Sequence, residues 1–112
     1  MFYPEMILQL PDADIPFVGV KGKILQSSDY QMVFFEIDGI GKVPEHSHGA
    51  QWGVVLSGTM ELTIDGITKT YTKGDSYFIP KDRKHSACFR EKTFVLDLFA
   101  DRDRYPVKSD PD

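Results

Sequence analysis

Short, evenly spaced turn signals constrain the fold of this chain more than any other feature of its sequence. Turn sequences containing Gly, Pro or Asp recur at residues 38–41, 48–49, 57–58, 65–66, 73–75 and 80–82. The segments between them have strand length and are rich in β-branched and aromatic residues: 30–37, 51–56, 60–64, 67–72, 76–79 and 92–99. Short strands at regular spacing, joined by such turns, indicate an all-β sandwich or barrel. We expect no helix of ordinary length.

One turn also predicts which strands pair. Asp65-Gly66 is a strong hairpin signal, because a type I′ turn requires positive φ at both of its central residues. Residues 60–64 should therefore pair with residues 67–72. After residue 100 the sequence becomes polar, and such a segment is expected to fray or to be disordered. We therefore expect one barrel domain at residues 1–100, followed by a polar C-terminal tail at residues 101–112.

Two predicted strands, residues 30–37 and 92–99, carry apolar side chains on both faces. On the first, Val33, Phe35 and Ile37 define the face that is expected to point inward. A sheet with one solvated face should alternate apolar and polar residues, so a second layer must cover the other face. The N-terminal segment of the chain and a partner subunit are both candidates for this layer, and a homodimer is expected. Trp52, out of phase with Gln51, is expected in the core.

Composition excludes several classes of partner. The formal net charge of −4, the pI near 5.3 and the absence of any basic run argue against nucleic acid. No apolar segment is long enough to span a membrane, and the N-terminal residues do not resemble a signal peptide. The single cysteine, Cys88, excludes an internal disulfide framework and fits a reducing compartment. We therefore expect a cytoplasmic protein.

The chain has only three histidines, and two of them, His46 and His48, lie one residue apart. On a strand, residues i and i+2 point to the same face. Neutral imidazoles are common metal ligands, and a carboxylate or carbonyl oxygen often completes the shell. His85, from a distant strand, can meet the pair inside a small barrel, so we interpret the trio as a metal site. The alternative is that His46 and His48 are solvated and that His85 makes a hydrogen bond in a turn.

The histidines belong to two motifs that resemble the paired motifs of the cupin superfamily. The first motif is formed by Gly41, His46, His48, Gln51 and Gly58, and the second by Gly74, Pro80, Asp82 and His85. The chain is most similar to small, single-domain conserved-barrel cupins, which implies a double-stranded β-helix or jelly-roll barrel. Three residues depart from the family pattern, and one of them is Phe89, which replaces a common Asn. Gln51 stands where a Glu is usual, and Asp82 replaces a turn glycine whose geometry Asp tolerates well.

The resemblance also implies a ligand set. It indicates one divalent transition metal ion (Zn, Ni, Fe, Co or Mn) held by His46, His48 and His85. By its place in the motif, Gln51 would add its amide oxygen; alternatively, it is an ordinary polar residue beside a three-histidine site. A neutral fourth ligand leaves the full dipositive charge on the ion, which makes the ion a stronger Lewis acid. Some polyketide-cyclase-type cupins look similar in combining three histidines with a glutamine.

These features favour a metal-dependent enzyme that acts on a small organic molecule by Lewis-acid chemistry, as a cyclase or isomerase does. Two other hypotheses stay open: a non-catalytic barrel that binds a small ligand, and a metal-dependent dioxygenase. Ala87 and Phe89 have the same strand parity as His85 and are expected to line the pocket. The sequence assigns no catalytic group beyond the metal ligands.

Overall fold

The computed structural model describes residues 2–109, which form nine β-strands and one helix of four residues. In chain order the elements are α1 (Glu5–Leu8), β1 (Val20–Gln26), β2 (Gln31–Ile37), β3 (Gly41–His46), β4 (Gln51–Ser57), β5 (Thr59–Ile64), β6 (Ile67–Thr72), β7 (Ser76–Ile79), β8 (His85–Phe89) and β9 (Thr93–Phe99). Within this part of the chain no helix is long and apolar enough to cross a membrane.

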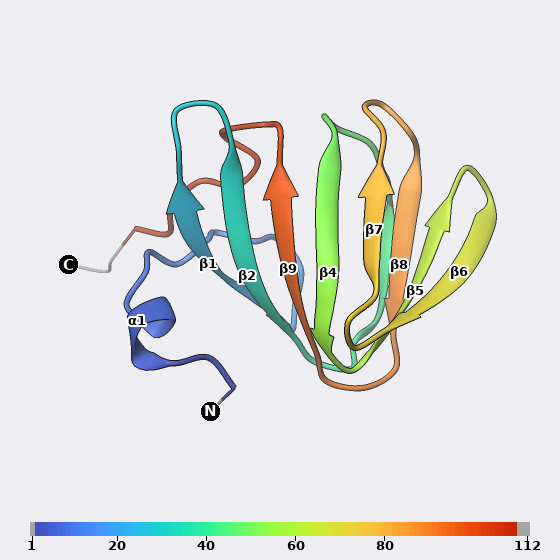
Figure 1. The fold of residues 1–112 in the computed structure, drawn as a ribbon, viewed down its shortest axis with the longest axis horizontal. Coiled ribbons are helices and arrows are strands. Elements are labelled where there is room, and N and C mark those ends of the chain that lie inside the picture. The colour runs from blue at the N-terminus through green and yellow to red at the C-terminus, as the bar shows by residue number, and fades with distance from the viewer. Residues whose placement is uncertain (1, 110–112) are drawn as a thin grey trace.

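The strands form two antiparallel sheets. One has the order β1-β2-β9-β4-β7, and the other has the order β3-β8-β5-β6. Figure 1 shows the strands of the first sheet side by side in this order. The inner faces of the two sheets share one apolar core, whose most buried members include Ile24, Val33, Val55, Met60, Leu62, Ile79 and Val95. The predicted all-β jelly-roll architecture is confirmed.

The predicted hairpin is also confirmed. β5 and β6 pair in antiparallel register, with Ile64 opposite Ile67. Asp65 and Gly66 between them have φ values of 49° and 82°, so both central residues are left-handed as a type I′ turn requires. Asp82 has a φ of 65°, which shows that Asp adopts the conformation for which the family usually uses glycine.

The five-stranded sheet presents two different faces, built from neighbouring residues. We call Ile24, Val33, Asp97, Gly53 and Tyr77 the inner row, because they are paired across the five strands and face the core. We call their sequence neighbours Leu25, Met32, Leu98, Trp52 and Phe78 the outer row, on the opposite face. The expected inward face of β2 is confirmed. The expectation that Trp52 lies in the core is wrong, because its side chain belongs to the outer row and is 42% exposed.

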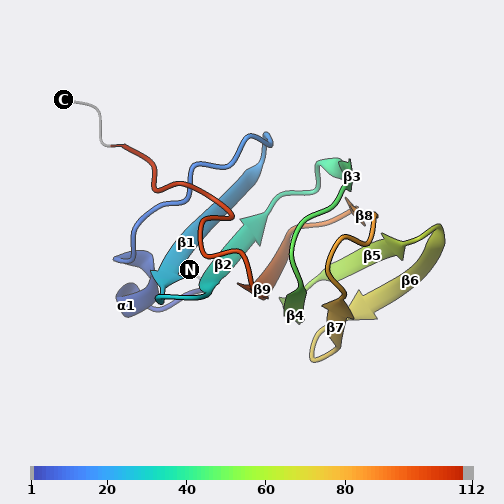
Figure 2. The ribbon, with the colours of Figure 1, turned by 90° about the horizontal axis from the view of Figure 1, so that it is seen from above.

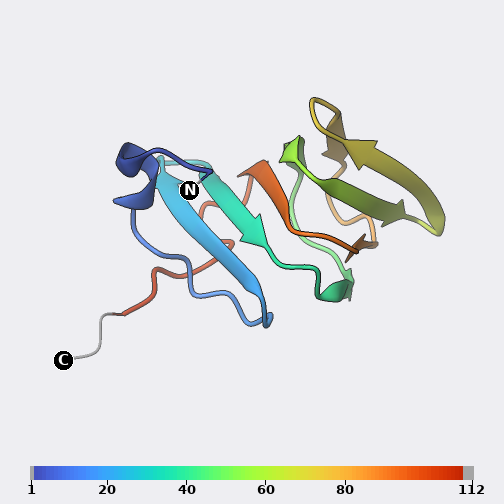
Figure 3. The same cartoon turned by 90° about the horizontal axis from the view of Figure 1, so that it is seen from below.

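The N-terminal segment covers one end of the outer face. The Phe2 ring stacks on Phe94 with centroids 4.2 Å apart, and the Tyr3 ring meets the Phe34 ring edge-on at 5.8 Å. The Tyr3 hydroxyl donates a hydrogen bond of 2.7 Å to the carbonyl oxygen of Phe35. Figure 3 shows this segment and α1 beside the β1–β2 end of the sheet. The outer row is not covered in this way, since Trp52 and Phe78 remain largely exposed.

Residues 101–109 do not behave as the expected fraying tail. Tyr105 is only 7% exposed and belongs to the core. The buried Gln31 amide donates to the Tyr105 carbonyl at 2.9 Å and accepts from the Tyr105 N–H at 3.1 Å. Val107 forms a β-bridge with Ala13. Figure 2 shows the chain after β9 returning over β2 and β1. The buried Tyr105 ring, the hydrogen bonds of Gln31 and backbone bonds to Asp12 and Asp14 hold this polar segment. Residues 110–112 lie outside the described residues.

Candidate metal centre

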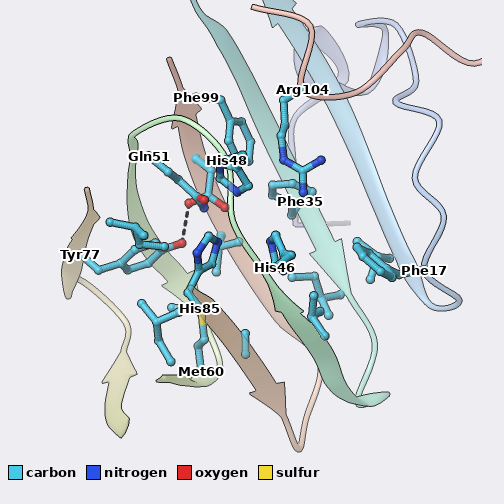
Figure 4. Close-up of a pocket in the computed structure, with 18 of the residues that line it drawn as sticks. Phe17, Phe35, His46, His48, Gln51, Met60, Tyr77, His85, Phe99 and Arg104 are labelled. Atoms are coloured by element: carbon cyan, nitrogen blue, oxygen red, sulfur yellow. Dashed lines mark hydrogen bonds between the residues drawn. The ribbon is translucent and has the colours of Figure 1, made fainter. Parts of the chain in front are cut away.

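The three histidines meet at one end of the barrel. His46 is the last residue of β3 and is paired with His85, the first residue of β8, while His48 lies in the loop that follows β3. The expectation that His46 and His48 share a strand is therefore wrong. The β3–β8 register shifts between Val43 and His46, around Pro44, which has no N–H to donate to the ladder. Even so, one ring nitrogen from each histidine lies within 4.8 Å of the others. Figure 4 shows the three rings close together at the pocket.

Backbone carbonyls fix the orientation of all three imidazole rings. The Nδ1 atoms of His46, His48 and His85 lie 2.8, 2.9 and 2.9 Å from the carbonyl oxygens of Pro44, Gly49 and Arg83. A carbonyl only accepts hydrogen bonds, so each Nδ1 must carry the proton. Each neutral ring then has its lone pair on Nε2. Nε2 of His48 is buried and has no hydrogen-bond partner. This arrangement suits metal coordination, in which the second ring nitrogen is held by an outer hydrogen bond.

Electrostatics keep these rings neutral. Burial is the main cause that lowers the pKa of His46, His48 and His85, and for His48 it lowers the pKa to about 4. The positive charge of Arg104 lowers all three pKa values further. The Asp101 carboxylate lies 3.7 Å from Nδ1 of His48, but with a neutral ring this contact is not an ion pair at neutral pH. Neutral imidazoles are the form that binds a metal.

Gln51 begins β4 on the same inner face and is 8% exposed. A hydrogen bond from its side chain lowers the pKa of the Asp97 carboxyl, so its amide NH₂ is directed at Asp97. Its other polar atom, Oε1, is buried and has no hydrogen-bond partner. A buried acceptor without a partner is unfavourable unless another group binds it. This orphaned oxygen lies beside the histidine cluster in the wall of the same cavity.

Asp97 and Tyr77 form a buried pair that sequence reasoning did not identify. The Tyr77 hydroxyl donates to Asp97 at 2.6 Å across the intervening strand β4. Gly53 stands between them in the inner row, and a Cβ atom there would collide with both side chains. Burial raises the pKa of Asp97 to about 6, although its hydrogen bonds from Tyr77 and Gln51 act in the opposite direction. An acidic residue with inward strand parity, alone in an apolar strand, was the signal available in the sequence.

The site opens into a cavity of about 80 Å³ between the two sheets. Its wall includes the three histidines, Gln51, Asp97 and apolar side chains from both sheets, among them Phe35, Ile37, Met60, Leu62, Ala87 and Phe89. The prediction that Ala87 and Phe89 line the pocket is confirmed. Arg104 and Phe17 also line it, and sequence reasoning missed both because they lie outside the predicted strands. A cavity of this size admits only a small ligand or one part of a larger ligand.

Comparison with known proteins identifies the family. The cupin domain, as a sequence family, matches residues 33–97, which is more than half of the chain. The chain belongs to the cupin superfamily. No curated protein matches its sequence.

Solved structures show the same fold. An RmlC-like cupin from Shewanella frigidimarina is 27% identical, with 91% of this chain and 88% of that chain covered and a TM-score of 0.74. KdgF from a Halomonas species is 24% identical, with 88% of each chain covered and a TM-score of 0.70. A single-substitution variant of oxalate decarboxylase from B. subtilis is 18% identical with a TM-score of 0.73; the match covers 87% of this chain but 29% of that one. The last two show similarity of fold alone.

Proposed function

We propose that this cupin is a mononuclear metal-dependent enzyme that acts on a small organic molecule with an enolisable carbonyl group. His46, His48 and His85 would hold one divalent transition metal ion, and the amide oxygen of Gln51 would complete the protein ligands. A divalent ion held by these neutral donors keeps its full positive charge and supplies Lewis acidity to a substrate oxygen. The reaction class that fits is cyclisation, isomerisation or hydration.

One observation carries the proposal. Three Nδ1–H groups are tied to carbonyl oxygens, which leaves three Nε2 lone pairs in one cluster beside the unpartnered Oε1 of Gln51. A structural role for the histidines would leave two buried acceptors, Nε2 of His48 and Oε1 of Gln51, without partners, which costs free energy. Coordination of a cation satisfies them together. The Asp97 carboxylate supports the Gln51 ligand by fixing which end of its amide faces the cluster.

The remaining residues prepare the cavity for a substrate. Apolar side chains from both sheets line most of the cavity wall, and a bound substrate would exclude water from the region beside the histidines. Exclusion of water strengthens electrostatic interactions between the site and its ligand. Alternatives to this function are a dioxygenase and a non-catalytic barrel that binds a small ligand. Neutral ligands favour Lewis-acid chemistry over oxygenation, because oxidised iron or manganese is better matched by anionic ligands.

The first experiment is elemental analysis of the protein purified without a histidine tag. We expect about one transition metal ion per chain. Enolisable keto acids and polyketide-like compounds should then be screened with and without oxygen, with product and oxygen uptake both followed. Turnover should not depend on oxygen. Turnover that stops without oxygen and consumes it in proportion to product would replace the Lewis-acid proposal by the dioxygenase hypothesis. Metal binding without turnover of any compound would favour the binding barrel.

Gln51→Glu tests the charge argument directly. An anionic ligand would cancel one unit of the ion's charge, so the metal should stay bound while turnover slows. Gln9→Glu adds the same charge at an exposed position after α1 and is the matched control. Faster turnover in the Gln51 variant would show that the charge argument has the wrong sign.

We also propose that the protein is a homodimer that packs through the outer row. Leu25, Trp52 and Phe78 are 51, 42 and 58% exposed on this sheet face. Contiguous exposed apolar side chains of this kind mark association surfaces. A twofold axis would bring the row against its own copy, with Trp52 and Phe78 as aromatic anchors.

A further inference from the structure

Arg104 is a pocket residue that the proposed function has not used. It lies in the segment after β9, next to the buried Tyr105 that fixes this segment to the barrel. Its guanidinium carbon lies 4.3 Å from the centre of the Tyr105 ring and 5.7 Å from that of Phe99. In Figure 4 the guanidinium points into the pocket, on the side where His46 lies. The two aromatic rings thus hold a cation at the wall of the cavity.

This guanidinium forms no salt bridge within the part of the chain that the structure describes. Among residues 2–109, its Nε atom is also buried without a hydrogen-bond partner. Two carboxylates of this region accept hydrogen bonds from other groups. Asp97 accepts from Tyr77 and Gln51, and Asp101 accepts from the Gly49 N–H at 2.7 Å. A partly buried charge without a partner is costly, and it is retained where a ligand supplies the counter-charge.

The charge balance of the pocket points the same way. The three imidazoles are neutral, and Gln51 adds no charge where the family usually has a carboxylate. A divalent ion and Arg104 would therefore bring three positive charges to the pocket, and the Asp97 carboxylate in its wall would offset only one of them. Guanidinium groups bind planar carboxylates through two parallel N–H···O bonds. A ligand with a carboxylate would satisfy the orphaned Nε–H of Arg104 and balance this charge.

We propose that Arg104 binds the carboxylate of the substrate, which makes the substrate class a small oxo acid with a carboxylate and an enolisable carbonyl. The enolisable carbonyl in this substrate class rests on the proposed function. The carboxylate site itself rests on Arg104 and exists with or without a metal. The cavity of about 80 Å³ fits an acid with only a few carbon atoms.

The side-chain Nε–H signal of Arg104 in a ¹H–¹⁵N NMR spectrum gives a direct test. Arg104→Lys removes this signal and so assigns it. Pyruvate and pyruvamide are the probes, because they have the same number of non-hydrogen atoms and differ in charge. In both metal-free and zinc-loaded protein, pyruvate should shift the signal and pyruvamide should not. The absence of a shift with pyruvate, lactate and acetate alike would overturn the proposal.

Affinity measured by calorimetry on the zinc-loaded protein gives the second test. Arg104→Gln should weaken pyruvate binding by about 10- to 100-fold, the loss expected for hydrogen bonds to a charged group. Arg104→Lys should have an intermediate effect, because it keeps the charge and loses the planar fork. Arg102→Gln, at a neighbouring exposed arginine, is the matched control and should bind pyruvate like the wild type. Zinc content and thermal unfolding should be unchanged in the control and in Arg104→Lys.

The two proposals can fail separately. If the wild type binds no metal while pyruvate still shifts the Arg104 signal, the proposed metal-dependent function fails and the carboxylate site stands. If zinc binds and oxygen-independent turnover is found, but Arg104→Gln binds pyruvate as tightly as the wild type, the carboxylate site fails and the metal-dependent function stands.

Discussion

The two faces of the five-stranded sheet are one residue apart on every strand, yet they have opposite chemistry. The inner row contains the hydrogen-bonded pair Tyr77 and Asp97, with Gly53 between them. The outer row contains only apolar side chains, and two of them are large and exposed aromatics. Tyr77 and Asp97 of the inner row line the cavity that the histidine cluster also lines, whereas the outer row lies on the opposite face of the sheet.

The difference shows what each face requires of its residues. A polar group on the inner face must be satisfied within the barrel, so its partners and the space between them are fixed. An apolar side chain on the outer face needs only a surface to cover it, whether the N-terminal segment or a second copy of the chain. Because strand parity assigns each residue to a face, a slip of one residue would exchange the two sets. Variants on each face should therefore have separable effects.

The largest expected effect is on metal binding at the histidine cluster. Replacement of both His48 and His85 by Ala removes two of the proposed ligands and should lower metal affinity by more than about 100-fold, beyond what loss of an outer partner causes. The barrel should stay folded, since a chain of this length has a sufficient core without metal. Elemental analysis and circular dichroism are the measurements. Cys88→Ser, on the same strand as His85, is the control and should retain the metal. Metal content that survives the double replacement would show that the ligand assignment is wrong.

The next effect is on folding and comes from Gly53. In Gly53→Ala the new methyl group would occupy the space through which Tyr77 reaches Asp97. Overpacking of this kind costs about 1–3 kcal/mol, and the separated pair adds to this cost. The free energy of unfolding in urea is the measurement. Ser76→Ala, an exposed position on β7 paired with Val54, is the control and should change stability by less than about 0.5 kcal/mol. Equal stability of both variants would mean that the inner row tolerates a side chain at this position.

The sequence predicted the inner face better than the outer face. Turn spacing and the Asp65-Gly66 signal were sufficient for the all-β fold and one hairpin, because these are local properties of the chain. The histidine trio was recognisable because its members lie in two short sequence motifs that resemble those of the cupin superfamily. The exposure of Trp52 was not predictable from local pattern, since a large apolar residue on a sheet suits a core and an interface equally well.

The role of the C-terminal segment was hidden for a different reason. Its composition is that of a disordered tail, yet Tyr105 inserts into the core and brings Arg104 to the cavity wall. A single aromatic anchor and the Gln31 amide hold this segment over a separation of more than 70 residues. Such long-range contacts leave no periodic signal in the sequence. Asp97 left a weak one, as a charge with inward parity in an apolar strand.

A pH titration of the metal-free protein sharpens the comparison within the inner face. The pKa of His48 is about 4 in the native state and 6.5 as a free side chain, so the unfolded state takes up a proton first as the pH falls. Stability should therefore decrease between about pH 6.5 and pH 4, by at most about 1.4 kcal/mol per pH unit for each proton. Asp97 acts on stability in the opposite direction, because its pKa is raised from 3.8 to about 6 in the native state. Its protonated carboxyl stabilises the native state at low pH, and this stabilisation is lost as the pH rises through 6. In urea unfolding across this range, the free energy of unfolding of Asp97→Asn should fall more steeply with decreasing pH than that of the wild type. An equal or shallower loss would contradict the assigned pKa shifts.

A variant in the outer row should have the smallest effect on metal binding. Such a variant tests most directly whether the two faces of the sheet act independently. Trp52→Lys introduces a charge into the proposed dimer surface, next in sequence to Gln51 but on the opposite face of β4. A charge buried in an apolar interface without a partner opposes association. Light scattering should show a dimer for the wild type and a monomer for the variant, while metal content per chain stays the same. Ile67→Lys is the matched control, because it adds the same charge at an exposed apolar residue of the other sheet and should leave the dimer intact. A monomeric wild type would end the dimer proposal. Loss of metal in Trp52→Lys alone would mean that the two faces are coupled through β4, so that Gln51 depends on the packing of its neighbour as well as on its hydrogen bond to Asp97.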